Sequence, residues 1–170
     1  MLSEWSRTTA TLAGLAALAL AWPATLPAAD TSTDLEARCR AEVVELHEFL
    51  ELWSNGELQP TEAAFARFAA VIAPGFRIID PDGEVAGRGP IVDAIRRAHG
   101  RWLDTPGRIR IERFTLHHTV GDHALATYEE WHEVGDDVTG RLSSVLFGPN
   151  AGAPNGLEWL HLHEVWISEE

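Results

Sequence analysis

The chain has 170 residues, of which 45% are hydrophobic and 23% charged, which is enough for one globular domain with a buried core. Its formal net charge is −13, and all 13 basic residues are arginines that form no evident basic patch. Such a chain repels phosphate groups, so we expect no nucleic acid among its partners, and no membrane beyond an N-terminal signal segment.

Residues 1–29 differ from the rest of the chain. Arg7 precedes an apolar run over residues 12–22, and Pro23, Pro27 and Ala28 follow it. This pattern predicts a signal peptide and a periplasmic or secreted protein; retention as an uncleaved anchor is the alternative. Residues 30–40 are expected to form a polar linker and the start of the first helix, and residues 41–168 the folded domain.

The first half of this domain has helical periodicity. Thr33 to Glu36 form a capping box, and Asn55-Gly56 ends the helix that it opens. Thr61 can cap a second helix, which Ala73-Pro74-Gly75 stops before a strand over 76–80. The first helix should bury one stripe of side chains at steps of three and four residues: Cys39, Val43, Leu46, Leu50 and Trp53. We expect Cys39, the only cysteine, to be half-buried.

A third amphipathic helix is predicted from Pro90 to 104–107, and the pattern then becomes that of strands. Four long strands are expected, over 108–119, 123–134, 141–147 and 157–168. Short turns between neighbours indicate antiparallel pairing. We therefore predict an α+β fold, with three N-terminal helices packed on a strongly curved antiparallel sheet, a cone that leaves an internal pocket.

Asp80 is the first candidate for chemistry. It follows the apolar strand 76–80 and precedes Pro81-Asp82-Gly83, a turn signal. A carboxylate beside Phe76 and Ile78 would have a raised pKa and could act as a general base. The alternative is that Asp80 only caps its turn.

Histidines and tryptophans supply the other candidates. Alternate residues of a strand share a face, so Trp159, His161 and His163 should point the same way. With His118 and other histidines they could bind a metal, although ordinary hydrogen-bonded histidines are the simpler interpretation, and we expect no metal and no cofactor. Tryptophans either fill the core or line a pocket.

One strand has two alternating sets of side chains. Tyr128, Glu130 and His132 form one set, and 129, 131 and 133 form the other. The pattern leaves open which set faces inward. Motifs for hydrolase triads, phosphate-binding loops and dinucleotides are missing from the sequence.

Three segments together resemble the nuclear-transport-factor-two-like superfamily, in its SnoaL-like and ketosteroid isomerase-like branch. They are the end of the first helix over 49–58, the Asp80-Pro81-Asp82-Gly83 turn with the helix after it, and the closing strand over 159–168. The resemblance covers residues 41–168. It implies a cystatin-like cone fold, often dimeric, that holds a small hydrophobic molecule.

The resemblance also implies site residues. In the ketosteroid isomerases the aspartate of the turn is the base, which corresponds to Asp80. Their oxyanion donors are a tyrosine, which is Phe49 here, and an aspartate that the strand 141–147 lacks. Val165 replaces the second histidine of the SnoaL-like ending, which leaves His163.

These patterns predict an exported protein that binds a small apolar or aromatic molecule. The alternatives are an isomerase, cyclase or dehydratase with Asp80 as base, and a dimeric interaction module; a homodimer is expected. Two sets of residues are candidates for the site. The catalytic candidates are Asp80, His163 and Tyr128, and the ligand-pocket candidates are Phe49, Trp53, Trp102, His118, Trp159 and His161.

Overall fold

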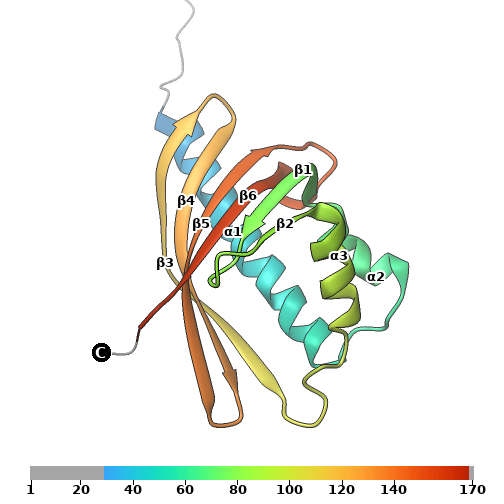
Figure 1. Ribbon diagram of the computed structural model, residues 1–170. Coiled ribbons are helices and arrows are strands. Elements are labelled where there is room, and N and C mark those ends of the chain that lie inside the picture. Colours follow the sequence, from blue (N-terminus) through green and yellow to red (C-terminus); the bar gives the residue numbers. More distant parts are fainter. Residues whose placement is uncertain (1–28, 169–170) are drawn as a thin grey trace, which may run out of the picture.

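The computed structural model describes residues 29–168. A six-stranded sheet curves strongly around α1, which lies across its concave face, while α2 and α3 pack beside the C-terminal half of α1 (Figure 1). The predicted α+β cone fold is thus confirmed. The predicted signal peptide lies outside the described residues except for Ala29. No helix within the described part is long and apolar enough to cross a membrane.

Three helices form as predicted, with different ends. They are α1 (Ala29–Ser54), α2 (Glu62–Ala69) and α3 (Arg88–Arg97). Thr61 caps α2 as expected, because its hydroxyl accepts a hydrogen bond from the Ala64 N–H at 3.2 Å. The expected linker and the capping box at Thr33 were wrong, because α1 already begins at Ala29. Helix α3 ends at Arg97, so Trp102 lies in a loop rather than on a helix.

The sheet has the strand order β2-β1-β6-β5-β4-β3. Antiparallel pairing joins β3 to β4, β4 to β5 and β5 to β6, as the turn signals predicted. The sheet is nevertheless mixed, because β1 runs parallel to β6, and a short β2 pairs with β1. Strand bounds are β1 (Ile72–Ile79), β2 (Val85–Gly87), β3 (Gly107–Val120), β4 (His123–Val134), β5 (Asp137–Pro149) and β6 (Leu157–Trp166), with a 3-10 turn η1 (Pro154–Gly156) before β6.

The core fills the space between α1 and the concave face of the sheet. Phe49 stacks on Trp53 at 5.6 Å between ring centroids, and Phe65 and Phe68 of α2 pack against the same pair. Cys39 is fully buried rather than half-buried, and its burial raises the pKa of the thiol to about 11.

A buried carboxylate ties four elements together beside this core. Glu42 of α1 is fully buried and accepts two hydrogen bonds from the Arg67 guanidinium of α2, both at 3.1 Å. It also accepts from Asn155 Nδ2 at 3.1 Å and Trp159 Nε1 at 3.2 Å. We call these four residues the Glu42 cluster. It fixes the indole of Trp159 and so the wall of the cavity described below.

A bulge in β6 decides which of its side chains face inward. Leu146 pairs with His161 and Phe147 pairs with Trp159, so Leu160 has no partner on β5. The extra residue shifts the alternation by one step. Trp159, Leu162 and Glu164 therefore face the concave side, and His161 and His163 do not.

Candidate functional site

A cavity of about 160 Å³ lies between α1, α3 and the concave face of the sheet. We call it the cone cavity. Its volume is close to that of buried apolar cavities, roughly 150 Å³, that admit a single benzene ring. Apolar side chains form most of its lining: Leu46, Leu50, Phe68, Ile72, Phe76, Ile78, Ile91, Ile95, Ile109, Trp159 and Leu162.

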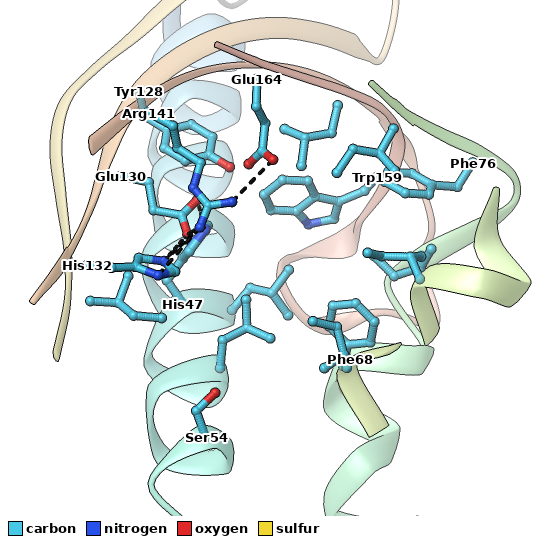
Figure 2. Close-up of a pocket in the computed structure, with 18 of the residues that line it drawn as sticks. His47, Ser54, Phe68, Phe76, Tyr128, Glu130, His132, Arg141, Trp159 and Glu164 are labelled. Carbon is cyan, nitrogen blue, oxygen red and sulfur yellow. Dashed lines mark hydrogen bonds and ion pairs between the residues drawn. The ribbon is translucent and has the colours of Figure 1, made fainter. Parts of the chain in front are cut away.

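Polar side chains gather on one side of the cone cavity, opposite Phe68 and Phe76 (Figure 2). Three of them, Tyr128, Glu130 and His132, come from β4, where alternate residues share a face. This is the set whose direction the sequence left open, and it faces inward. The others on this side are His47, Arg141 and Glu164, and Ser54 and Arg101 also belong to the lining.

Glu130 is the centre of this polar wall. Its carboxylate is 5% exposed and lies 3.1 Å from His47 Nε2 and 2.6 Å from His132 Nε2. Arg141 Nη2 is 3.5 Å from the same carboxylate, and Arg141 Nη1 donates to Glu164 Oε2 at 3.3 Å. We call these five residues the Glu130 cluster; Figure 2 shows its hydrogen bonds and ion pairs.

The pKa values of the residues in the Glu130 cluster depend on the charges of their neighbours. Burial alone would raise the pKa of Glu130, but His47, His132 and Arg141 together hold that pKa well below its ordinary value. Burial alone would lower the pKa of His47, but the Glu130 carboxylate outweighs it and the pKa is raised. For Glu164, burial dominates and the pKa is raised. At neutral pH the wall therefore holds an ionised Glu130 against Arg141 and a histidine inclined to carry a proton.

Tyr128 is fully buried on the same wall. Its Oη is the one buried side-chain nitrogen or oxygen atom in the described part of the chain that has no hydrogen-bond partner. Ser143 lies opposite Tyr128 in the β4–β5 pairing, but its hydroxyl donates to Glu164 Oε1 at 3.4 Å. A buried hydroxyl without a partner costs about 1–3 kcal/mol, which a bound acceptor would recover.

The phenol of Tyr128 keeps its proton at neutral pH. Burial and the carboxylates of Glu130 and Glu164 raise its pKa well above the ordinary value, and the nearby Ser143 hydroxyl and Arg141 oppose this only in part. The hydroxyl points into the cone cavity (Figure 2). It is therefore a hydrogen-bond donor available to a molecule in that space.

The structure places Asp80 outside the cone cavity. Its Oδ1 accepts hydrogen bonds from the backbone N–H groups of Asp82 at 3.0 Å and Glu84 at 2.8 Å. Gly83, at φ 86°, completes the turn. Asp80 thus caps its turn, and it is absent from the cavity lining.

The candidate histidines also lie elsewhere. His163 is exposed and His161 half-buried, and neither lines the cavity, because the bulge at Leu160 turns both away from Trp159. The expectation that these three share a face was wrong. His118 is exposed on β3. Among the side chains described over residues 33–168, no three His, Cys, Asp or Glu residues form a group that could hold a metal ion.

Of the aromatic candidates, Trp159 lines the cone cavity, whereas Phe49, Trp53 and Trp102 lie outside the lining. Phe49 and Trp53 are buried in the core behind the lining, where Trp53 Nε1 donates to the Ile95 carbonyl at 2.8 Å. Trp102 packs edge-on against His132, with ring centroids 5.7 Å apart. Among the candidates, only Tyr128 and Trp159 belong to the lining itself.

Most of the Glu130 cluster was missed in the sequence. His47 lies four residues after Val43, so helical periodicity alone could have placed it on the buried face of α1. Arg141 and Glu164 meet only through the register of β5 and β6, and the bulge brings Glu164 inward. Single-strand patterns carry no signal for that pairing.

Solved structures with the same fold come from several bacteria. An NTF-2 like protein of unknown function from Pseudomonas aeruginosa has a TM-score of 0.68 and 24% identity over 77% of this chain and 99% of its own. Aln2 from a Streptomyces species (TM-score 0.56, 17% identity) covers 84% of this chain and 94% of its own. ActVI-ORFA from Streptomyces coelicolor (TM-score 0.53, 15% identity) covers 78% and 97%. The fold is that of the NTF2-like superfamily, as the sequence resemblance implied.

Curated relatives are plant proteins. Sucrose-phosphatase 1 of Nicotiana tabacum is 24% identical over 127 residues, and probable sucrose-phosphatase 2 of Arabidopsis thaliana is 27% identical over 128. These alignments cover 74% and 75% of this chain, but the chain spans only about 30% of the length of each relative. Residues 39–168 match the family described as sucrose-6-phosphate phosphohydrolase C-terminal, and the chain belongs to that family.

Proposed function

We propose that the cone cavity binds a small molecule with a ring-sized apolar body and a hydrogen-bond acceptor for Tyr128. The observation that carries this proposal is the Tyr128 hydroxyl, a protonated donor that is fully buried, faces the cavity and has no partner. Native proteins rarely leave such a group unpaired, and a ligand would pair it.

The lining supports an apolar body. Phe68, Phe76 and Trp159 face the cavity together with aliphatic side chains of α1, α3 and the sheet. A site that is mostly apolar, with a few converging polar groups, is the usual form of a small-molecule site. The Glu42 cluster holds Trp159 in one orientation, so this part of the lining is formed before a ligand arrives.

An isomerase, cyclase or dehydratase activity with Asp80 as base stays a prediction, and it has little support here. The Asp80 carboxylate serves its own turn and lies outside the cavity lining. If the cavity is a catalytic site, the groups in reach of a ligand are Tyr128 as a hydrogen-bond donor and His47 and Glu130 as proton carriers.

Ligand-observed NMR with phenol-type ring compounds tests the binding proposal. We expect saturation transfer to 4-hydroxybenzyl alcohol with the wild-type protein, and loss of the signal in Leu162→Phe, which fills the cavity without changing its charges. Val120→Phe, at a 78% exposed position outside the lining, is the matched control and should bind as wild type does. Equal signals from both variants would place the binding outside the cone cavity and contradict the proposal.

We also propose that the chain forms a homodimer through the outer face of its sheet. Leu125, Leu142 and Val165 are 37%, 41% and 44% exposed, and Leu142 lies opposite Val165 in the β5–β6 pairing. Light scattering should give the mass of a dimer for wild type and of a monomer for Leu142→Glu. A monomeric wild type would contradict this proposal.

Export is the third proposal, and it rests on the signal pattern of residues 1–29. Expression of the full chain in a Gram-negative host should deliver a shortened protein to the periplasm. Edman sequencing of that protein would then start near residue 29. A cytoplasmic protein that keeps Met1 would contradict export.

A further inference from the structure

We propose that Arg101 selects a monoanionic carboxylate ligand, whose charged end it binds at the mouth of the cone cavity. This inference rests on the proposed binding function and adds the class of ligand. The ligand would be a small ring acid, with its ring among the apolar side chains, its carboxylate at Arg101 and a second polar group at Tyr128.

Arg101 is the cavity-lining cation without a carboxylate partner. Among the described residues, no hydrogen bond or ion pair of its guanidinium is found, whereas Arg141 is held by Glu130 and Glu164. Other arginines of the described chain, such as Arg97, also lack an ion pair with a carboxylate, but they do not line the cone cavity. A guanidinium that faces a cavity and is free to bind matches a carboxylate with two parallel hydrogen bonds.

The loop that carries Arg101 is built to hold it in place. On either side of Arg101, the Gly100 and Trp102 N–H groups donate to the carbonyls of Trp53 at 3.0 Å and Ser54 at 2.9 Å, at the end of α1. The guanidinium lies over the Trp102 ring, 4.5 Å from its centroid.

Trp102 is itself fixed, which extends this platform to the polar wall. One side of its indole packs against His132 of the Glu130 cluster. The ring also lies so close to Gly107 that a Cβ atom there would be 2.5 Å from it. The Trp102 ring therefore forms a rigid support, and Arg101 is oriented before a ligand binds.

The charge of the wall favours one negative charge in the ligand. The charges of Glu130 and Glu164 offset those of Arg101 and Arg141, and the raised pKa of His47 favours one further positive charge on the wall. Partial burial and the positive charge of Arg141 lower the pKa of Arg101, and the negative charge of Glu130 opposes them. Arg101 is therefore within electrostatic range of both Arg141 and Glu130. A monoanion neutralises this excess. A phosphate ester brings up to two negative charges, one more than this excess.

The two free donors lie at different depths. Tyr128 is fully buried, and Arg101 is solvent-exposed. A ring with polar groups at opposite ends can pair with both, and a ring fits the cavity volume of about 160 Å³. 4-Hydroxybenzoate has this arrangement, and 4-hydroxybenzyl alcohol has the same ring and phenol without the charge.

Calorimetric titration of these two compounds tests the inference. We expect Arg101→Gln to weaken 4-hydroxybenzoate binding about tenfold and to leave 4-hydroxybenzyl alcohol binding within about twofold of wild type. Arg101→Lys should restore part of the loss, since it keeps the charge without the planar fork. Arg97→Gln removes the same charge from an exposed position outside the lining and should bind both compounds as wild type does.

The other outcomes separate this inference from the function on which it rests. If both compounds bind in the cavity and neither depends on Arg101, the carboxylate selection is wrong and the binding function stands. If neither compound binds, both proposals fail for ring ligands of this size. Because relatives of the chain are sucrose-phosphatases, glucose 6-phosphate belongs in the same series; tighter, Arg101-dependent binding of this sugar phosphate would overturn the carboxylate class.

Discussion

Two of the buried carboxylates of this domain, Glu42 and Glu130, have opposite surroundings. Glu42 accepts hydrogen bonds from three side chains and is not part of the cone cavity lining, and no buried polar side-chain atom of its cluster is unpaired. Glu130 joins two histidines and an arginine on the wall of a cavity, beside the unpaired hydroxyl of Tyr128. The side chains of both clusters are paired within the protein, but only the second has an unpaired donor beside it, and the binding proposal rests on that donor. In this domain, a buried charge therefore indicates a candidate binding site only where a hydrogen-bond donor beside it is unpaired.

Replacing Glu130 should have the largest effect. Glu130→Gln leaves the side chain of His47, which is only 6% exposed, without its carboxylate partner, and removing one partner of a buried ion pair costs about 3–5 kcal/mol. Urea denaturation at neutral pH measures the free energy of unfolding. Exposed Glu48→Gln is the control and should be near wild type. A loss below about 1 kcal/mol would show that the cluster carries little stability.

The same change at Glu42 should cost less. Arg67 is 20% exposed and lies 3.8 Å from Glu45, so it keeps access to water and to a second carboxylate when Glu42 is neutralised. We expect Glu42→Gln to cost about 1.5–3 kcal/mol, the usual contribution of hydrogen bonds to a charged group. Ligand affinity should change only slightly. A larger loss in the free energy of unfolding for Glu42→Gln than for Glu130→Gln would contradict this comparison of the two clusters.

Much of the fold follows from sequence periodicity, because local patterns determine which elements form. The four long strands were predicted within a few residues of β3 to β6, except that β5 starts four residues earlier. The parallel pairing of β1 with β6 was not predicted, because it joins segments more than eighty residues apart. The bulge at Leu160 was missed for the same reason: it is defined by β5 and leaves no local signal in β6.

The candidate site was harder to predict than the fold. Tyr128, predicted as a catalytic candidate, and Trp159, predicted as a pocket residue, both line the cone cavity, and their roles stay predictions. The other lining residues that carry charge depend on tertiary contacts. Asp80 is the opposite case, because it was named as a site candidate and lies outside the cavity lining. Its Asp-Pro-Asp-Gly sequence supports a turn and a base equally well, and only the hydrogen bonds from Asp82 and Glu84 show that the carboxylate is occupied.

Stability should depend on pH through the Glu130 cluster. The pKa of His47 is raised in the folded state, so its ion pair stabilises the fold fully below the ordinary value of 6.5 and is lost as pH rises through the raised pKa. The pKa of Glu130 is depressed, so its contribution is present above 4.5 and is lost as pH falls through the depressed pKa. His132, Arg141 and Glu164 share this environment.

Thermal melting of wild type and His47→Gln, from below pH 4.5 to above pH 6.5, tests this pH dependence of stability. As pH rises through the raised pKa of His47, the melting temperature of wild type should fall relative to that of the variant. The variant cannot lose this ion pair, because it has no imidazole at position 47. Exposed His118→Gln should keep the wild-type profile. Parallel profiles for wild type and His47→Gln would contradict the raised pKa.

Removing the free hydroxyl should have the smallest effect on stability. Tyr128→Phe deletes an unpaired buried group, so we expect a change of stability between zero and a gain of about 1 kcal/mol by urea denaturation. Binding of 4-hydroxybenzoate should nevertheless weaken about fivefold or more. A clear loss of stability would show that the hydroxyl has a hydrogen-bond partner in the protein itself, as the polar groups of the Glu42 cluster do.

A crystal structure of the complex with 4-hydroxybenzoate tests the central claim most directly. The account predicts the ring inside the cone cavity, with an acceptor oxygen about 2.7 Å from Tyr128 Oη and the carboxylate against Arg101. A ligand bound elsewhere, or one inside the cavity that leaves Tyr128 Oη unpaired, would contradict it.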